Sequence, residues 1–241
     1  MIYALRYLLI ALYTVIWGSA GIVLAFADRS GAAIIWVAQN WLRWVMRSCG
    51  IRVEAVGLEN IDPRRSCILM SNHQSVFDIA ALVDTLPIRW KFVAKRELVW
   101  IPFFGWALAA SRQIIIDRGN REKSVRSLAR AAERIREGEN VIVFPEGTRS
   151  QTATLGPFKS GGFHLAIQAG VPIIPVSVSG SWRITPKRSL RVESGRILIR
   201  YGKPIPTRDL SIEDRAFLKQ QVREAIVAGF DPELQGSTSR G

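Results

Sequence analysis

Residues 66–78 read SCILMSNHQSVFD, and this stretch decides the fold that the sequence predicts. Its apolar first half has the length of a buried strand, and the residues after Asp78 have a helical pattern. The turn between them holds His73, one of only two histidines in the chain, with Asp78 five residues further on. A carboxylate fixes the tautomer of an imidazole and stabilises its protonated form, so the pair indicates a general base.

The same residues also fit a capping box, in which Asp78 replaces the commoner glutamate and Ser75 is the cap. His73 would then be an ordinary turn residue. The two interpretations are compatible, because a capped helix start holds Asp78 rigid and a residue just before it can turn back onto that carboxylate.

A second polar turn, residues 144–150 (FPEGTRS), follows another apolar run about seventy residues later. The planar guanidinium of Arg149 suits two phosphate oxygens. Gly147 lets backbone amides approach an anion closely. A base at one turn and a phosphate-suited arginine at the other predict proton abstraction on a phosphorylated substrate.

From residue 51 onward, short apolar runs alternate with helical stretches, which predicts an α/β fold with a mixed, largely parallel sheet of about seven strands covered by helices. Both polar turns follow strands, so they are expected to face each other at the carboxyl edge of the sheet. The predicted strands are 51–56, 66–70, 90–94, 113–117, 141–144, 173–178 and 197–201, and the predicted helices are 75–86, 102–110, 121–137, 160–169 and 212–228.

The chain has 241 residues and a formal net charge of +13, which calls for an anionic partner. Patterns typical of nucleic-acid-binding modules are missing, so a membrane surface or an acidic substrate is favoured. Seven basic residues against one acid mark a stretch that is either a solvated strand pair or a binding face: Arg183, Lys187, Arg188, Arg191, Arg196, Arg200 and Lys203.

Several chemistries find no support in the sequence. Cys49 and Cys67 lack metal-ligand spacing, so neither a metal site nor a disulfide framework is expected, and a reducing compartment is favoured. No Gly-x-Ser-x-Gly elbow, P-loop or dinucleotide fingerprint occurs, and we expect no cofactor. Without a protein nucleophile, the nucleophile is expected to be a substrate hydroxyl.

The N-terminal fifty residues predict a two-helix membrane anchor. Leu8–Ala27 is uncharged and would span roughly 30 Å as a helix, which matches a bilayer core. Ala32–Cys49 has one polar stripe and three tryptophans, as an interfacial helix does. A cleaved secretory signal is an alternative for the first segment. Full spanning and insertion in one leaflet both fit the sequence.

The chain resembles the bacterial 1-acylglycerol-3-phosphate acyltransferases (lysophosphatidic acid acyltransferases). Four blocks carry the resemblance in the family's order, over roughly residues 51–205: Asn72-His73-x4-Asp78, residues 113–118 (QIIIDR), residues 144–150 (FPEGTRS) and residues 171–176 (VPIIPV). Ser111 stands where the family usually has glycine. The resemblance implies a glycerolphosphate acyltransferase-like fold at residues 51–235, after the anchor at 1–50 and before a disordered tail at 236–241.

The implied reaction transfers a fatty acyl group from acyl carrier protein or acyl-coenzyme A to the 2-hydroxyl of lysophosphatidic acid, giving phosphatidic acid. His73 would take the hydroxyl proton, and Asp78 would orient the imidazole. Glu146 is expected to bind the glycerol hydroxyl or to fix Arg149. The implied substrate-binding residues are Lys95, Arg118, Glu146, Gly147, Thr148 and Arg149.

The resemblance also implies a location and leaves two rivals. The donors reside in the cytoplasm, so the expected place is the cytoplasmic face of the inner membrane, in contact with membrane lipid. One rival is an acyltransferase of the same architecture acting on another lyso-lipid, such as a lyso-ornithine lipid. The other is a basic membrane-surface binding protein without catalysis, which would need neither His73 nor Asp78.

Overall fold

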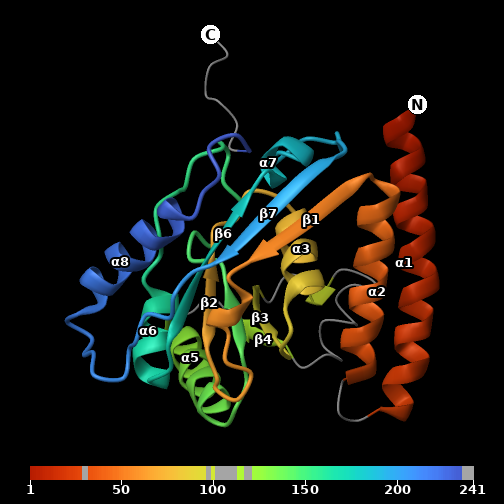
Figure 1. The fold of residues 1–241 in the computed structure, drawn as a ribbon. Helices are drawn as coiled ribbons and strands as arrows, with labels where there is room; N and C mark the ends of the chain where they lie inside the picture. The colour runs from red at the N-terminus through yellow and green to blue at the C-terminus, as the bar shows by residue number, and fades with distance from the viewer. Residues whose placement is uncertain (29–31, 96–98, 101–112, 117–120, 235–241) are drawn as a thin grey trace.

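A computed structural model describes residues 1–28, 32–95, 99–100, 113–116 and 121–234 of the protein (Figure 1). Seven strands form one sheet in the order β1-β7-β6-β2-β5-β3-β4. The strands are β1 (Ile51–Val56), β2 (Ile68–Ser71), β3 (Lys91–Lys95), β4 (Ile114–Ile116), β5 (Val141–Val143), β6 (Ile173–Ser179) and β7 (Gly195–Tyr201).

The sheet is mixed and largely parallel, which confirms the predicted fold class. Strands β2 to β6 run parallel to one another, whereas β7 is antiparallel to β6 and parallel to β1. The carboxyl ends of β6, β2, β5 and β3 therefore lie side by side at one edge. Both polar turns leave from this edge, since one follows β2 and the other follows β5.

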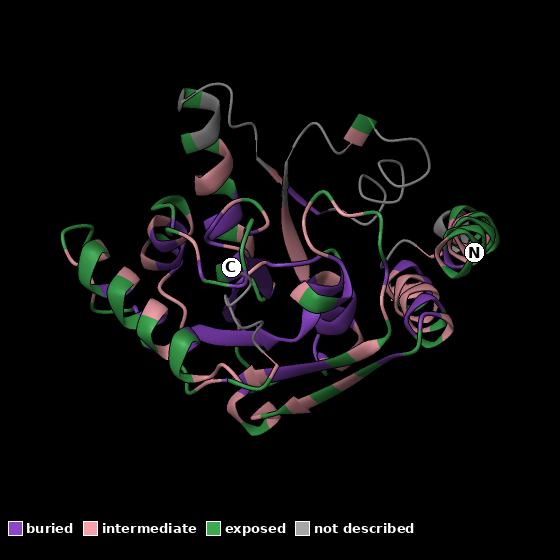
Figure 2. Cartoon of the chain, turned by 90° about the horizontal axis from the view of Figure 1, so that it is seen from above, coloured by how far each residue is buried: buried purple, intermediate pink, exposed green. Residues whose placement is uncertain are grey.

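Helices cover both faces of the sheet (Figure 1). Within β5, Ile142 packs in the cluster of α3, whereas Val141 and Val143 pack on the opposite side with α5, α6 and α8. This alternation gives two apolar cores separated by the sheet, and the central strands are buried (Figure 2). The helices are α3 (Phe77–Thr85), α5 (Arg121–Arg136), α6 (Gly161–Ala169) and α8 (Arg215–Ala228), with the short α7 (Ser181–Ile184) and the 3-10 helix η1 (Leu58–Asn60).

The second N-terminal helix, α2 (Ala32–Ser48), packs into the core on the α3 side. Val45 and Met46 are buried there, and Arg43 forms an ion pair with Asp84 of α3. The predicted division at residue 50 stays a prediction, but these contacts show that α2 shares its core with the sheet.

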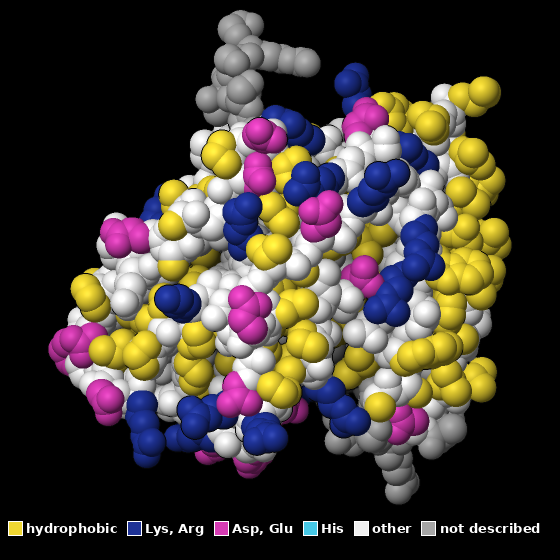
Figure 3. Space-filling model, in the orientation of Figure 1, with side chains coloured by type: hydrophobic (Ala, Val, Ile, Leu, Met, Phe, Trp, Pro, Cys, Tyr) yellow, Lys and Arg dark blue, Asp and Glu magenta, His cyan; other side chains and the backbone are white. Residues whose placement is uncertain are grey.

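The first helix, α1 (Ile2–Ala27), lies along α2 and presents a long apolar stripe to the outside (Figure 3). The Trp17 ring meets the rings of Trp36 and Trp44 edge-on, and Arg6 donates a hydrogen bond to the carbonyl of Val192. Residues 2–24 are long and apolar enough to cross a membrane, judged by length and composition. The large apolar residues that α1 exposes include Ile2, Leu5, Leu8, Leu12, Val15, Ile16, Ile22 and Val23.

The observed strands lie within a few residues of the predicted ones, and the predicted helix 102–110 lies outside the described residues. Sequence patterning missed η1 and α7, which are three and four residues long. Such short elements carry too few residues to show a helical period.

Candidate active site

Asp78 lies in the first turn of α3, and its buried carboxylate organises the first polar turn. Oδ2 lies 2.9 Å from His73 Nδ1, and it accepts backbone N–H bonds from Gln74 at 2.6 Å and Ser75 at 2.8 Å. The carboxylate therefore holds the backbone of the turn and the imidazole at once. The capping box expected from the sequence is only half formed: Asp78 accepts the Ser75 N–H, but the N-cap of α3 is Val76, which makes no side-chain cap hydrogen bond.

An aromatic ring fixes the plane of the His73 imidazole, in addition to the contact with Asp78 that fixes where its Nδ1 points. Its ring stacks on Phe144 with 4.1 Å between centroids and 21° between planes, and Phe144 in turn stacks on Phe92. The His73 side chain is 14% exposed. With Nδ1 donating to Asp78, Nε2 is the nitrogen left to accept a proton.

Asn72 fixes the turn from the other side, a role that its place in the motif did not reveal. Its buried side chain donates from Nδ2 to the carbonyl of Val178 at 2.9 Å and accepts the Val178 N–H on Oδ1 at 2.7 Å. This two-way pairing ties the end of β2 to β6, so the turn cannot shift without breaking two buried hydrogen bonds.

The second polar turn closes tightly and meets the first. Pro145 and Glu146 are its central residues, and the Gly147 N–H donates to the carbonyl of Phe144 at 2.9 Å. Gly147 has φ +72°, a conformation that a side chain would strain. The Ser150 N–H donates to the carbonyl of His73 at 2.7 Å, which brings the two motifs together as the sequence predicted.

Glu146 is buried, and its hydrogen bonds go to the backbone rather than to Arg149, which corrects one of its two expected roles. Oε1 accepts the His73 N–H at 2.8 Å, and Oε2 accepts the Gly156 N–H at 2.9 Å. Burial raises the pKa of this carboxyl, and the two backbone N–H groups oppose the rise. The expected contact with a glycerol hydroxyl stays a prediction.

Of the three cations expected at the site, the structure describes the side chain of Arg149 alone. Arg149 is half-buried, and within the described part of the chain its guanidinium makes no hydrogen bond or ion pair. Lys95 ends β3, next to β5, and only its backbone is described. Arg118 lies outside the described residues.

Lys187 joins this edge from the loop after α7. Its Nζ donates to Thr148 Oγ1 at 3.2 Å, so a cation from the basic stretch reaches the second polar turn. The sequence showed Lys187 only as one of seven basic residues, because nothing local marks the one that folds back over β5.

The first polar turn, the second polar turn and the apolar strand of residues 171–176 all fall inside one match to a known family. The model described as "Acyltransferase" matches residues 52–179, just over half of the chain. The chain belongs to the acyltransferase family. Asn72, His73, Asp78 and residues 144–150 all lie inside the matched segment, whereas Lys187 lies beyond it.

Curated relatives of this acyltransferase carry a consistent name. The chain is 38% identical over 179 residues to the 1-acyl-sn-glycerol-3-phosphate acyltransferase of Pseudomonas aeruginosa, covering 72% of the chain and 68% of the relative. For the Haemophilus influenzae protein of that name, identity is 30% over 240 residues, covering 97% and 98%. The bovine alpha enzyme is 37% identical over 182 residues, which is 75% of the chain but only 63% of the bovine protein.

A solved structure resembles this acyltransferase along its whole length. The crystal structure of the 1-acyl-sn-glycerophosphate (LPA) acyltransferase from Thermotoga maritima superposes with a TM-score of 0.82 at 27% identity. The match covers 99% of this chain and 97% of that one, so it includes both N-terminal helices as well as the sheet.

Proposed function

We propose that the protein transfers a fatty acyl group from a thioester, acyl carrier protein or acyl-coenzyme A, to the 2-hydroxyl of lysophosphatidic acid, giving phosphatidic acid. The observation that carries the proposal is the His73–Asp78 pair, set beside the second polar turn in an acyltransferase whose curated relatives are named for this reaction. No cofactor takes part.

In this mechanism His73 Nε2 removes the acceptor hydroxyl proton as the hydroxyl oxygen attacks the thioester carbonyl. Asp78 keeps Nδ1 protonated and stabilises the imidazolium that forms. The tetrahedral intermediate then collapses, the carbon–sulfur bond breaks, and the departing thiolate takes the proton from His73. A base positioned in this way typically contributes 10²–10⁴-fold to the rate.

The acceptor phosphate is assigned to the cations around the second polar turn, and the substrate-binding residues proposed are Lys95, Arg118, Gly147, Thr148 and Arg149, joined by Lys187. What supports this is the half-buried guanidinium of Arg149, which has no hydrogen-bond or ion-pair partner among the described residues, and the approach of Lys187 to Thr148. A guanidinium and an ammonium on one side of a site suit a phosphate dianion.

Attachment to a membrane is part of the proposal, at the cytoplasmic face of the inner membrane, where the acyl donors are. The apolar stripe of α1 runs along the molecule beside α2 (Figure 3). Trp36 and Trp44 of α2 are also exposed. Tryptophan side chains favour the headgroup region of a bilayer.

The test is acyl transfer by the purified protein with lysophosphatidic acid and each thioester donor, followed by mass analysis of the lipid product. We expect phosphatidic acid, and a loss of at least about a hundredfold in kcat for His73→Ala. His164→Ala is the matched control, because His164 lies on α6 outside both polar turns. Near-normal turnover by His73→Ala would remove the base assignment.

Two other outcomes would replace the proposal. Transfer to a lyso-ornithine lipid, with none to lysophosphatidic acid, would assign another acceptor to the same architecture. Vesicle binding that survives His73→Ala, with no acyl transfer to any lyso-lipid, would make the protein a surface-binding protein.

A further inference from the structure

A chain of hydrogen bonds leads from α8 to the backbone of His73. It starts at Arg223, whose guanidinium donates to the carbonyls of Gly156 at 2.6 Å and Leu155 at 3.0 Å. The Gly156 N–H donates to Glu146 at 2.9 Å, and the other oxygen of Glu146 accepts the His73 N–H at 2.8 Å. We call these four links the hydrogen-bond chain.

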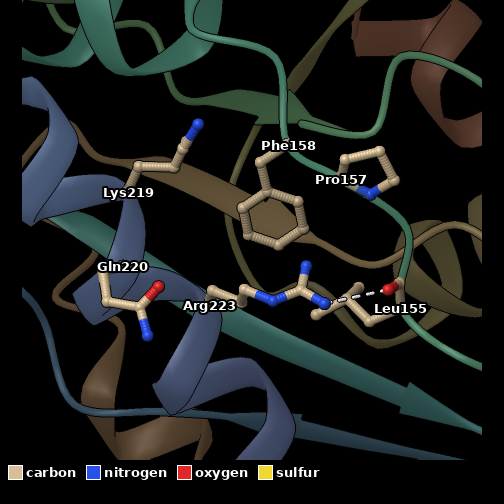
Figure 4. A pocket seen from close by; sticks show the side chains of 6 residues that line it. All are labelled: Leu155, Pro157, Phe158, Lys219, Gln220 and Arg223. Atoms are coloured by element: carbon tan, nitrogen blue, oxygen red, sulfur yellow. Dashed lines mark hydrogen bonds between the residues drawn. The ribbon is translucent and has the colours of Figure 1, made fainter.

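Arg223 is well placed to fix the loop that contains Gly156. It projects from α8, which is anchored by the fully buried Val222 and Ile226. Its guanidinium also lies over the ring of Phe158, 5.4 Å from the centroid, and Phe158 is buried (Figure 4). One rigid, planar group thus holds two successive carbonyls while its face lies on an aromatic ring, a fixed geometry that the compact point charge of a lysine ammonium lacks.

The loop has little room to move relative to Glu146. A Cβ added to Gly156 would come within 2.7 Å of Glu146 Oε2, so the close approach depends on the missing side chain. Among the described residues two N–H groups donate to the buried Glu146 carboxylate, one to each oxygen. A buried carboxylate depends strongly on such donors, because losing one leaves an oxygen without that partner. A shift of the loop is therefore passed to Glu146, and from Glu146 to the N–H of His73.

We propose that Arg223 is a positioning residue of the acyltransferase, which holds His73 in place through Gly156 and Glu146. Arg223 lies beyond residue 179, where the family match ends, and it touches neither the imidazole nor Asp78. The catalytic consequence rests on the proposed function, whereas the effect on the His73 imidazole does not.

The test compares Arg223→Met with the wild-type protein and with Lys219→Met. Lys219 lines the same hollow of about 380 Å³ beside Arg223, but makes no hydrogen bond or ion pair within the described chain, so its variant controls for the lost charge (Figure 4). The first readout is the pair of imidazole signals in protein labelled at histidine Cε1, followed through a pH titration.

The two histidines make the readout specific, because His164 serves as an internal reference. We expect the His73 signal of Arg223→Met to shift, while the His164 signal stays in place. Lys219→Met should reproduce the wild-type spectrum. An unchanged His73 signal in Arg223→Met would overturn the proposal, and so would equal shifts of both histidines, which would indicate general loosening.

The second readout is kinetic. Displacing a catalytic group by about an ångström can cost on the order of a hundredfold, so we expect Arg223→Met to lower kcat roughly ten- to a hundredfold with little change in the acceptor KM. Arg223→Lys should recover only part of the loss. A rise in acceptor KM with normal kcat would assign Arg223 to substrate binding and contradict the proposal.

Gly156→Ala decides the matter if Arg223→Met does not fold. It leaves Arg223 intact but pushes against Glu146 Oε2, so the same His73 shift is expected. No shift in this variant would overturn the proposal. Because the spectra need no substrate, the hydrogen-bond chain is judged separately from the acyl transfer itself.

Discussion

The amide of Ser150 donates a hydrogen bond of 2.7 Å to the carbonyl of His73, across seventy-seven residues of sequence. The N–H of His73 is held at the same time by Glu146. The second polar turn therefore hydrogen-bonds both the N–H and the carbonyl of His73. The residues proposed for acid–base chemistry and those proposed for phosphate binding form one rigid unit, and four predictions depend on it and on the fold around it.

Arg149 and Lys187 should each contribute separately to binding the acceptor phosphate. Arg149→Ala and Lys187→Ala are each expected to raise the acceptor KM about three- to tenfold with kcat nearly unchanged, because each removes one charge from a bound anion. The control is Lys203→Ala, an exposed cation of the same basic stretch. Steady-state kinetics with lysophosphatidic acid provides the measurement, and an unchanged KM for Lys187→Ala would remove that residue from the site.

Glu146 should make stability depend on pH in a defined direction. Burial raises its folded pKa above the ordinary 4.5, so the folded state binds more protons than the unfolded state between the two values. The contribution of this group to the free energy of unfolding therefore falls as pH rises through that window. Glu146→Gln lacks the titration, so the stability of the wild type relative to the variant should fall as pH rises above 4.5.

Thermal unfolding midpoints of the wild type and Glu146→Gln, measured as pH rises above 4.5, check this direction. A wild-type stability that grows relative to the variant as pH rises would contradict the prediction. Activity should also suffer in Glu146→Gln. An amide offers one acceptor oxygen, so its NH₂ group must face the N–H of either His73 or Gly156.

Two N-terminal deletions should behave differently. Removing residues 1–31 takes away α1 and leaves α2 in the core, so we expect a folded protein that no longer floats with liposomes at high salt. Removing residues 1–50 also deletes Val45, Met46 and Cys49 from the core, at a cost of several kcal/mol. That variant should unfold or aggregate, as circular dichroism and light scattering will show. Equal stability of the two would contradict the observed packing of α2.

Both cysteines should be inert in the folded protein. Burial raises the pKa of Cys67 to about 12, and it also raises the pKa of the fully buried Cys49. At pH 8 the reactive thiolate is then scarce, since only the thiolate attacks. A chromogenic disulfide reagent should react with neither thiol before unfolding and with both afterwards. Rapid release of one equivalent from the native protein would show that a cysteine is accessible.

Local patterning predicted most of the architecture, because each strand of the central sheet is a short apolar run between polar turns. The pair His73 and Asp78 was predictable for the same reason, since both residues lie in one turn. The antiparallel pairing of β6 with β7 was not, because no residue pattern distinguishes the direction in which a strand joins its neighbour.

The rest of the site depends on contacts between distant segments. Lys187 reaches Thr148 across thirty-nine residues, and Arg223 reaches Gly156 across sixty-seven. Basic side chains of this kind look alike in the sequence, and only the folded chain separates those that meet the polar turns from those that face solvent. The backbone role of Glu146 was hidden in the same way, because its partners are N–H groups that every residue carries.

The pairing of the first strand with the last has a consequence for biosynthesis. In the described sheet β1 lies at the edge, and its one neighbour is β7, which ends at Tyr201. A ribosome must therefore release about two hundred residues before β1 can join the sheet. By then the apolar α1 has long left the exit tunnel, so it is free to contact a lipid surface before the sheet is complete.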